Sequence, residues 1–302
     1  MEESKTSVQG RVIRDLIARF ASDNLIGRKL KTGELRKKMV EPAWKCPDCF
    51  LMQKIKMPQF EMELLTSMQN PREDKVVLQL HGGGYIGKMR NAYRTFAGLY
   101  SEVGRGISVL TIDYRVAPEH PFPAALEDTV EAYEWLLSCG FKPEQIIVAG
   151  DSAGGKLALS FVLKLKEQKR ILPRGLILFS PWTDLTGSGK SYATKGDVDP
   201  ILTREYLDNA IAAYASGQDL KNPLISPLFG DLTGFPPTYI QVGSNELLLS
   251  DSLLLKKNLE KYHVPVRLEE YKGMWHVFQM SPFKTAYDAM DQIAEFIFDI
   301  CR

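Results

Sequence analysis

Short apolar runs alternate with longer amphipathic segments along most of this chain. The short runs predict strands at 50–57, 60–67, 75–80, 107–113, 145–149, 175–180, 237–242 and 265–271. Apolar residues at helical spacing predict helices near 92–103, 123–138, 156–166, 250–262 and 282–300. The first two strands, separated by Pro58, favour a hairpin. Beyond them strands alternate with helices, which indicates an α/β fold with a mostly parallel central sheet flanked by helices.

Two segments fall outside this alternation. Residues 6–40 predict two short helices, the first with an apolar stripe between Val12 and Phe20. Residues 183–232 are rich in Gly, Asp, Ser and Pro and predict one helix at 203–216. No linker divides the sheet, so we expect a single domain over 1–302. We expect residues 1–45 and 186–220 to contribute a helical cap, with plain core packing of the N-terminal helices as the alternative.

The composition is that of an ordinary globular protein and not that of a nucleic-acid-binding or membrane protein. The chain carries 38 basic and 37 acidic residues, a net charge of +1, with 44% hydrophobic and 25% charged residues. This is typical of a globular protein and gives no electrostatic reason for a nucleic-acid or membrane partner. No apolar run reaches the length of a membrane span, and the first residues lack a secretory signal layout. We therefore expect a cytoplasmic protein; a monomer and a homo-oligomer are both compatible with the sequence.

The cysteines do not indicate a metal or redox centre. There are four, too few for a disulfide scaffold at this length. Cys46-Pro-Asp-Cys49 has no second cysteine pair and no suitably spaced histidines to complete a zinc site. An extended segment follows the motif, whereas a thioredoxin-like pair begins a helix. We interpret it as a surface turn and expect no metal and no organic cofactor.

The strongest chemical signal is Gly150-Asp-Ser-Ala-Gly154. It lies between a predicted strand and a predicted helix, which is the context that a nucleophile elbow requires. Glycines at both ends allow strand and helix to close tightly around a strained serine. Ser152 would then be held into solvent at the carboxyl end of its strand, beside a helix N-terminus that favours developing negative charge.

A nucleophilic serine needs a base and an acid that orients the base. In an α/β-hydrolase arrangement the chain order is serine, acid, histidine, and of the four histidines only His276 follows the last strand. The loop after the preceding strand offers Glu246 and Asp251 as the acid. Glu246 lies closer to the strand end, from which it can reach His276, and we predict it as the acid. Asp251 is expected in the first turn of the next helix, where a dipole contact stabilises by about 0.3–1 kcal/mol.

Acyl transfer also needs donors for an oxyanion. His81-Gly-Gly-Gly84 follows a predicted strand, and its unobstructed N–H groups together with that of Ala153 could supply them. A phosphate-binding loop would need a different glycine pattern, which is missing here.

Several motifs together resemble the hormone-sensitive-lipase-like esterases of the α/β-hydrolase superfamily. They are His81–Tyr85, Asp113–Asp128, Gly150–Gly155, Ser180–Leu185 and Met274–Phe278, in the family's order. The resemblance implies oxyanion donors at Gly83, Gly84 and Ala153, a structural His81, and a cap made partly from the N-terminus. The family's acid often stands in an Asp-Pro-Leu context, whereas here Glu246-Leu-Leu248 occupies that place.

The function that this resemblance implies is hydrolysis of carboxylic esters, through an acyl-enzyme on Ser152. The sequence shows no large apolar lid or membrane-binding stretch, so we expect small, uncharged esters with short acyl chains as substrates. A lactone or amide hydrolase using the same triad is one alternative. A non-catalytic small-molecule receptor of the same fold is the other, although a receptor has no need for a complete set of serine, histidine and acid.

Overall fold

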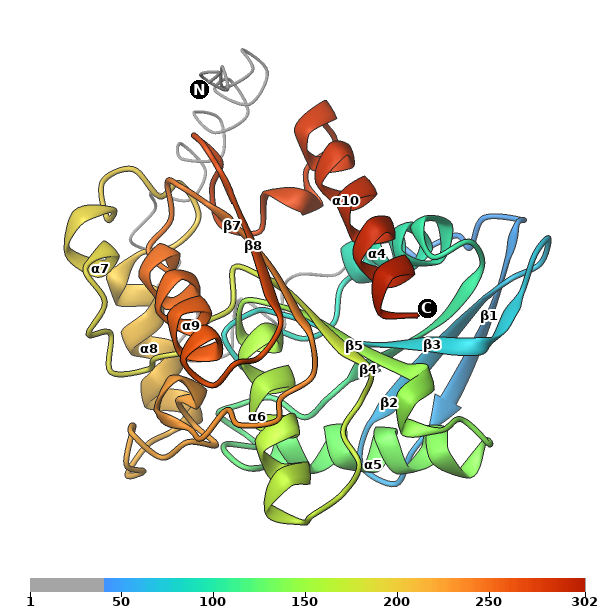
Figure 1. The fold of residues 1–302 in the computed structure, drawn as a ribbon, viewed down its shortest axis with the longest axis horizontal. Coiled ribbons are helices and arrows are strands. Elements are labelled where there is room, and N and C mark those ends of the chain that lie inside the picture. The colour runs from blue at the N-terminus through green and yellow to red at the C-terminus, as the bar shows by residue number, and fades with distance from the viewer. Residues whose placement is uncertain (1–40, 302) are drawn as a thin grey trace.

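The structure, a computed structural model, describes residues 41–301 and is built around an eight-stranded sheet with the order β1-β2-β4-β3-β5-β6-β7-β8 (Figure 1). The strands are β1 (Phe50–Lys56), β2 (Glu61–Ser67), β3 (Arg72–Leu80), β4 (Ile107–Asp113), β5 (Ile146–Asp151), β6 (Gly175–Phe179), β7 (Thr238–Gly243) and β8 (Val266–Tyr271). β2 pairs antiparallel with β1 and β4, and the other neighbouring pairs are parallel. The expected hairpin and mostly parallel sheet are confirmed.

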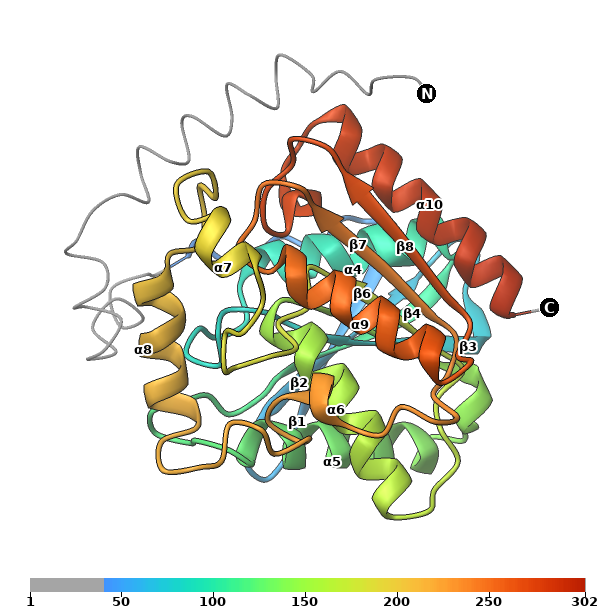
Figure 2. The ribbon, with the colours of Figure 1, turned by 60° about the vertical axis from the view of Figure 1, so that its left-hand side comes forward.

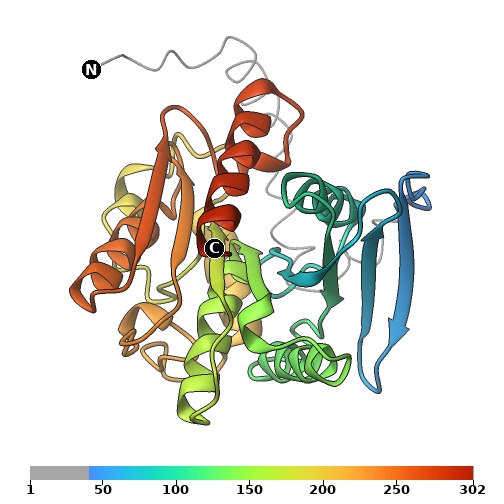
Figure 3. The ribbon, with the colours of Figure 1, turned by 45° about the vertical axis from the view of Figure 1, so that its right-hand side comes forward.

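Helices cover both faces of the sheet. α4 (Asn91–Val103) and α10 (Lys284–Ile300) lie on one face, and α5 (Ala124–Ser138), α6 (Ala153–Glu167) and α9 (Leu249–Lys261) lie on the other (Figure 3). In β3, Leu78 and Leu80 pack with α5 and α6, whereas Val77 packs with α4 and α10. Successive strand residues point to opposite faces, so a strand covered on both sides must be apolar throughout.

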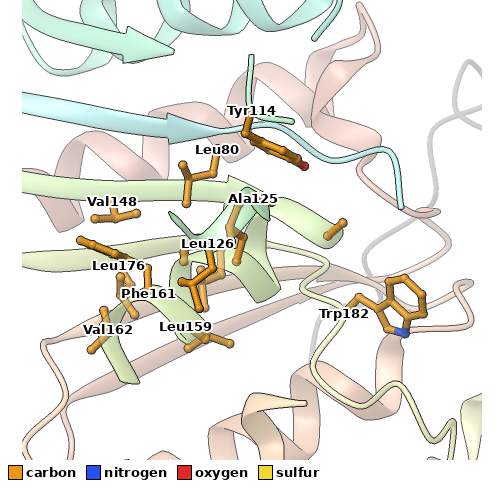
Figure 4. Packing of buried hydrophobic residues seen from close by; sticks show 14 of the residues in the cluster. Leu80, Tyr114, Ala125, Leu126, Val148, Leu159, Phe161, Val162, Leu176 and Trp182 are labelled. Atoms are coloured by element: carbon orange, nitrogen blue, oxygen red, sulfur yellow. The ribbon is translucent and has the colours of Figure 1, made fainter. Parts of the chain in front are cut away.

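The larger core lies between the sheet and the α5–α6 layer. Figure 4 shows Val148 and Leu176 from the strands facing Leu126, Phe161 and Val162 from the helices. All five side chains are buried. This continuous apolar contact fixes α6, and with it the turn that joins β5 to α6.

The segment 183–232, which we call the insertion, joins β6 to β7. It holds α8 (Arg204–Tyr214), as the pattern predicts, and also α7 (Ser191–Thr194), which is too short to leave a periodic signal. Thr203 begins α8 by accepting a hydrogen bond from the Tyr206 N–H at 3.1 Å. α7 lies beside α9 in two views (Figure 1, Figure 2), whereas α8 stands apart from α9 at the edge of the molecule in Figure 2. Short 3₁₀ turns occupy Pro143–Gln145, Pro227–Phe229 and Phe278–Met280.

Parallel strands bring their carboxyl ends to one edge of the sheet, which we call the carboxyl edge. The loops after β3, β5, β6, β7 and β8 leave from it, and they carry every residue that the sequence predicts for the site. The N-terminal helices expected at 6–40 lie outside the described residues. Of the expected N-terminal cap, Glu41 and Pro42 contact Asn91 at the start of α4. None of the described helices is long and apolar enough to cross a membrane.

Candidate active site

Ser152 occupies a sharp turn between β5 and α6. Its backbone has φ 53° and ψ −118°, an unfavourable conformation for a residue with a side chain. A Cβ on Gly150 would lie 2.4 Å from the carbonyl oxygen of Gly154, and one on Gly154 would lie 2.1 Å from that of Leu80. Glycine is therefore required at both positions for the turn to close.

Neighbouring loops hold Ser152 in this conformation. Its N–H donates to the Phe179 carbonyl at 2.9 Å, and its carbonyl accepts from the Trp182 N–H at 3.0 Å. Both partners belong to β6 and the residues after it. The side chain is only 7% exposed, so the expectation of a serine held into solvent is wrong in degree. The loops around the carboxyl edge cover it.

The glycine loop after β3 is fastened to the elbow. The Gly82 N–H donates to Oδ1 of Asp151 at 3.0 Å, and the Tyr93 hydroxyl donates to Oδ2 at 3.1 Å. Burial raises the pKa of Asp151 to about 6, although the charge of His276 and these hydrogen bonds oppose the rise. Asp151 thus sets the distance between the glycine loop and the elbow.

The middle of this loop can offer N–H groups to a ligand. Gly83 and Gly84 have φ values of 103° and 63°, a region that glycine enters without strain. Among the described residues neither N–H has a hydrogen-bond acceptor. Ala153 is the first residue of α6, and the first N–H groups of a helix have no partner within the helix. This arrangement can stabilise an anionic oxygen.

His276 and Glu246 form a buried pair at the same edge. His276 Nδ1 lies 3.4 Å from Oε1 of Glu246, and the two residues are 6% and 0% exposed. Burial alone lowers the pKa of His276. The hydrogen bond to Glu246 and its negative charge, with smaller contributions from Asp199 and Asp151, together outweigh that effect, so the pKa lies above the ordinary histidine value. The pair favours an imidazolium when a proton arrives.

The other carboxylate oxygen of Glu246 is held by two donors. Oε2 accepts from the Gly243 N–H at 2.9 Å and from the Ser180 hydroxyl at 2.8 Å. The Ser180 hydroxyl in turn accepts from the Val277 N–H at 3.2 Å. Ser180 therefore connects the acid to the histidine loop. Sequence reasoning places Ser180 only within the Ser180–Leu185 motif, and its position at the end of a predicted strand is the one signal in the sequence for this role. In the structure its backbone φ is 46°.

Asp251 lies in the first turn of α9, the helix after β7, as predicted, but its carboxylate binds another loop in addition to any contact with the helix dipole. It is 1% exposed, and Oδ2 accepts from the N–H groups of Thr183 and Asp184 at 2.7 and 2.9 Å. Burial raises its pKa to about 8, and the charge of Asp184 adds to the rise while the N–H bonds oppose it. Asp251 thus holds the start of the insertion, and no hydrogen bond joins it to His276.

His81 lies apart from the pair formed by His276 and Glu246. It is 0% exposed, and its ring stacks on Tyr114 with 4.0 Å between centroids and 4° between planes. Its Nδ1 lies 2.7 Å from the Gly82 carbonyl oxygen. Burial lowers its pKa despite the charge of Asp113. These contacts suit a packing role beneath the glycine loop.

The insertion reaches the glycine loop through α8. A Cβ on Gly84 would lie 2.9 Å from the Tyr206 hydroxyl and 3.3 Å from Cβ of Ala210. At the end of α8, the Tyr214 hydroxyl accepts a 2.7 Å hydrogen bond from Lys156, which is 0% exposed in α6. α8 therefore packs against both α6 and the glycine loop after β3.

Comparisons with known proteins show the family to which this chain belongs. Residues 77–280 match a family described as the alpha/beta hydrolase fold. The chain is 40% identical to an esterase of Acinetobacter venetianus over 227 residues, 74% of each chain. It is 39% identical to an acetyl-hydrolase of Streptomyces hygroscopicus over 207 residues, 68% of this chain and 69% of the other. The crystal structure of an esterase from the bacterial hormone-sensitive lipase family has a TM-score of 0.86 and 32% identity, covering 98% of this chain and 99% of its own.

Asp251 generates a prediction about stability. Asp251→Ala leaves the buried N–H groups of Thr183 and Asp184 without an acceptor, and we expect it to lower the free energy of unfolding by about 2–5 kcal/mol. Asp251→Asn keeps an acceptor oxygen and should cost much less. Chemical denaturation of both variants measures the difference. If Asp251→Ala lowers the free energy of unfolding by less than about 1 kcal/mol, a contact with the helix dipole is enough to explain the contribution of Asp251.

The same residue predicts a pH dependence. Its folded pKa lies above the unfolded value, so between about pH 4 and pH 8 folding takes up a proton and stability falls as pH rises. Asp251→Asn removes this effect. The melting temperature of the asparagine variant relative to the parent should therefore increase from pH 5 to pH 8. A difference that shrinks over this range would contradict the protonated state of Asp251.

Proposed function

Because the chain belongs to the α/β-hydrolase fold family and is a carboxylesterase of the hormone-sensitive-lipase-like type, we propose that Ser152, His276 and Glu246 form its catalytic triad. The observation that carries this proposal is the buried Glu246–His276 pair, with Nδ1 and Oε1 3.4 Å apart. Ser180 connects this pair to the segment that holds the Ser152 backbone. Gly83, Gly84 and Ala153 supply the oxyanion hole.

Acylation begins when the Ser152 hydroxyl oxygen attacks the ester carbonyl carbon. His276 takes the hydroxyl proton as the new C–O bond forms, and the Glu246 carboxylate stabilises the imidazolium. The carbonyl oxygen becomes an oxyanion that accepts hydrogen bonds from the N–H groups of Gly83, Gly84 and Ala153. The positive N-terminus of α6 adds to that stabilisation. His276 then protonates the leaving alcohol as its bond to the acyl carbon breaks.

Deacylation repeats these roles with water. His276 takes a proton from a water molecule while the water oxygen attacks the acyl carbon, and the same N–H groups hold the second oxyanion. Collapse expels the Ser152 oxygen, which recovers its proton from His276. The products are a carboxylic acid and the free enzyme. No residue changes its net protonation over the cycle.

Substrates of this enzyme are proposed to be small uncharged esters with short acyl chains. The close packing of Tyr206 and Ala210 against Gly84 limits the space beside the proposed oxyanion hole. One relative at 39% identity is an acetyl-hydrolase. We propose that the insertion acts as the cap over this space; the expected contribution of residues 1–45 falls mostly outside the described residues.

Lactones and amides could enter the same triad, so the reaction class needs a direct comparison. A panel of p-nitrophenyl esters of increasing acyl length, run beside lactones and anilides, ranks the three carbonyl classes by kcat/KM. We expect the shortest esters to give the highest values. A higher kcat/KM for a lactone or an anilide would favour the alternative.

The nucleophile is tested by Ser152→Ala. We expect loss of nearly all p-nitrophenyl ester hydrolysis, because oxyanion-hole binding alone supplies only about 10³–10⁴ over water. A sulfonyl fluoride should form an adduct that mass spectrometry locates on Ser152. Ser138→Ala changes an exposed serine of α5 and serves as the control. Parent-level turnover by folded Ser152→Ala would refute the serine mechanism.

The acid is tested by Glu246→Gln, which keeps the shape and one acceptor oxygen but removes the negative charge. We expect kcat to fall by about 10⁴, as in other triads that lose their acid, with the fold retained. Asp251→Asn is the matched control, since it makes the same acid-to-amide change at the other candidate acid, in the first turn of α9. If the control loses turnover and Glu246→Gln does not, Asp251 is the acid.

A further inference from the structure

Leu247, the residue after the proposed acid Glu246, forms hydrogen bonds with the insertion through both its N–H and its carbonyl group. The Leu247 N–H donates to Oδ2 of Asp199 at 2.8 Å, and the Leu247 carbonyl accepts from the Ser191 hydroxyl at 2.5 Å. Ser191 and Ser250 also exchange hydrogen bonds, each backbone N–H donating to the other's hydroxyl at 2.7 and 2.9 Å. Both polar backbone groups of the residue next to Glu246 are thus bound by side chains of another loop.

Asp199 is itself fixed. Its residue is 8% exposed, and Oδ1 accepts from the N–H groups of Ile201 and Leu202, both at 2.9 Å. Three N–H donors therefore face one carboxylate. An asparagine at 199 could accept only part of these hydrogen bonds, because its NH₂ group would face a backbone N–H donor where the carboxylate has an acceptor oxygen. Among the described residues no lysine or arginine forms an ion pair with Asp199.

A buried carboxylate without a cationic partner is costly, so its neighbours matter. Burial raises the pKa of Asp199, and the charge of His276 opposes the rise. For His276, the charge of Asp199 follows that of Glu246 in raising the pKa against the effect of burial, and Asp151 adds a smaller contribution. Glu246, Asp199 and Asp151 are thus the acidic groups that act on the imidazole.

We propose that Asp199 is a positioning residue for ester hydrolysis: it holds the Glu246 loop through Leu247, and its negative charge stabilises the His276 imidazolium. The inference rests on the triad proposed above. Asp199 does not touch the reacting atoms; it acts through Glu246 and His276. The insertion therefore takes part in catalysis as well as covering the site, because its residues 191–199 hold the acid in place.

Two variants separate the two effects. Asp199→Asn removes the charge and disturbs the bond to Leu247. Ser191→Ala removes the other bond to Leu247 and the bond from the Ser250 N–H, but no charge. Asp197→Asn neutralises an exposed carboxylate two residues away and is the control. For each, kcat and KM are measured with a short p-nitrophenyl ester from pH 5 to pH 9, with folding checked by circular dichroism.

We expect Asp199→Asn to lower kcat by about 10²-fold with KM within about twofold, since a small misplacement of a catalytic group has that effect. The acid limb of its kcat/KM profile should move to lower pH, because loss of a negative charge makes the imidazole easier to deprotonate. Ser191→Ala should lower kcat without moving the acid limb. The control should match the parent in both.

An acid limb that stays in place in Asp199→Asn, or an unchanged kcat, overturns the proposal. If the asparagine variant does not fold, Asp199→Ser is used instead, because a serine hydroxyl can accept from the Ile201 or Leu202 N–H but carries no charge. Glu246→Gln and Ser152→Ala are assayed in parallel. If either keeps parent activity, the triad itself is wrong; if both are inactive and Asp199→Asn behaves as the parent, only the role of Asp199 fails.

Discussion

One carboxylate joins the ends of three strands in this molecule. Glu246 receives the Gly243 N–H at the end of β7, the Ser180 hydroxyl after β6 and, at 3.4 Å, the imidazole of His276 after β8. The parallel sheet brings these loops to one edge, but nothing in a sheet sets the distances between them. A buried carboxylate with several acceptor positions can do so, because each donor that it leaves unpaired carries a free-energy cost.

The pattern of the chain predicts the parts of this arrangement that depend on local sequence. Strands covered on both faces are continuously apolar, and the glycines around Ser152 mark a tight turn, so the sheet, the elbow and the order of the site loops follow from sequence. The burial of Asp251, the role of Ser180 and the contact of Asp199 with Leu247 depend on residues about 50 to 100 positions apart along the chain. Such contacts leave no periodic trace, and the sequence could not separate Glu246 from Asp251 by packing.

The site concentrates buried carboxyl groups in a way that a stable core would avoid. Burial raises the pKa of Asp151 to about 6 and that of Asp251 to about 8, and it also raises the pKa of Asp199. N–H groups from the glycine loop, the insertion and the acid loop offset part of this cost. Departures of this kind from ordinary burial rules are typical of functional sites, where specific placement of charge outweighs stability.

The position of the insertion between β6 and β7 has a consequence for engineering substrate range. A cap segment is an attractive module to exchange between esterases, because it can be cut at two strand ends without touching the sheet. Here the exchange would also remove the side chains of Ser191 and Asp199, which form hydrogen bonds with Leu247 in the loop that carries Glu246. A chimera should therefore keep serine at 191 and aspartate at 199 when the rest of the insertion is exchanged. Without them the Glu246 loop would shift, and a change in activity could not be assigned to substrate fit alone.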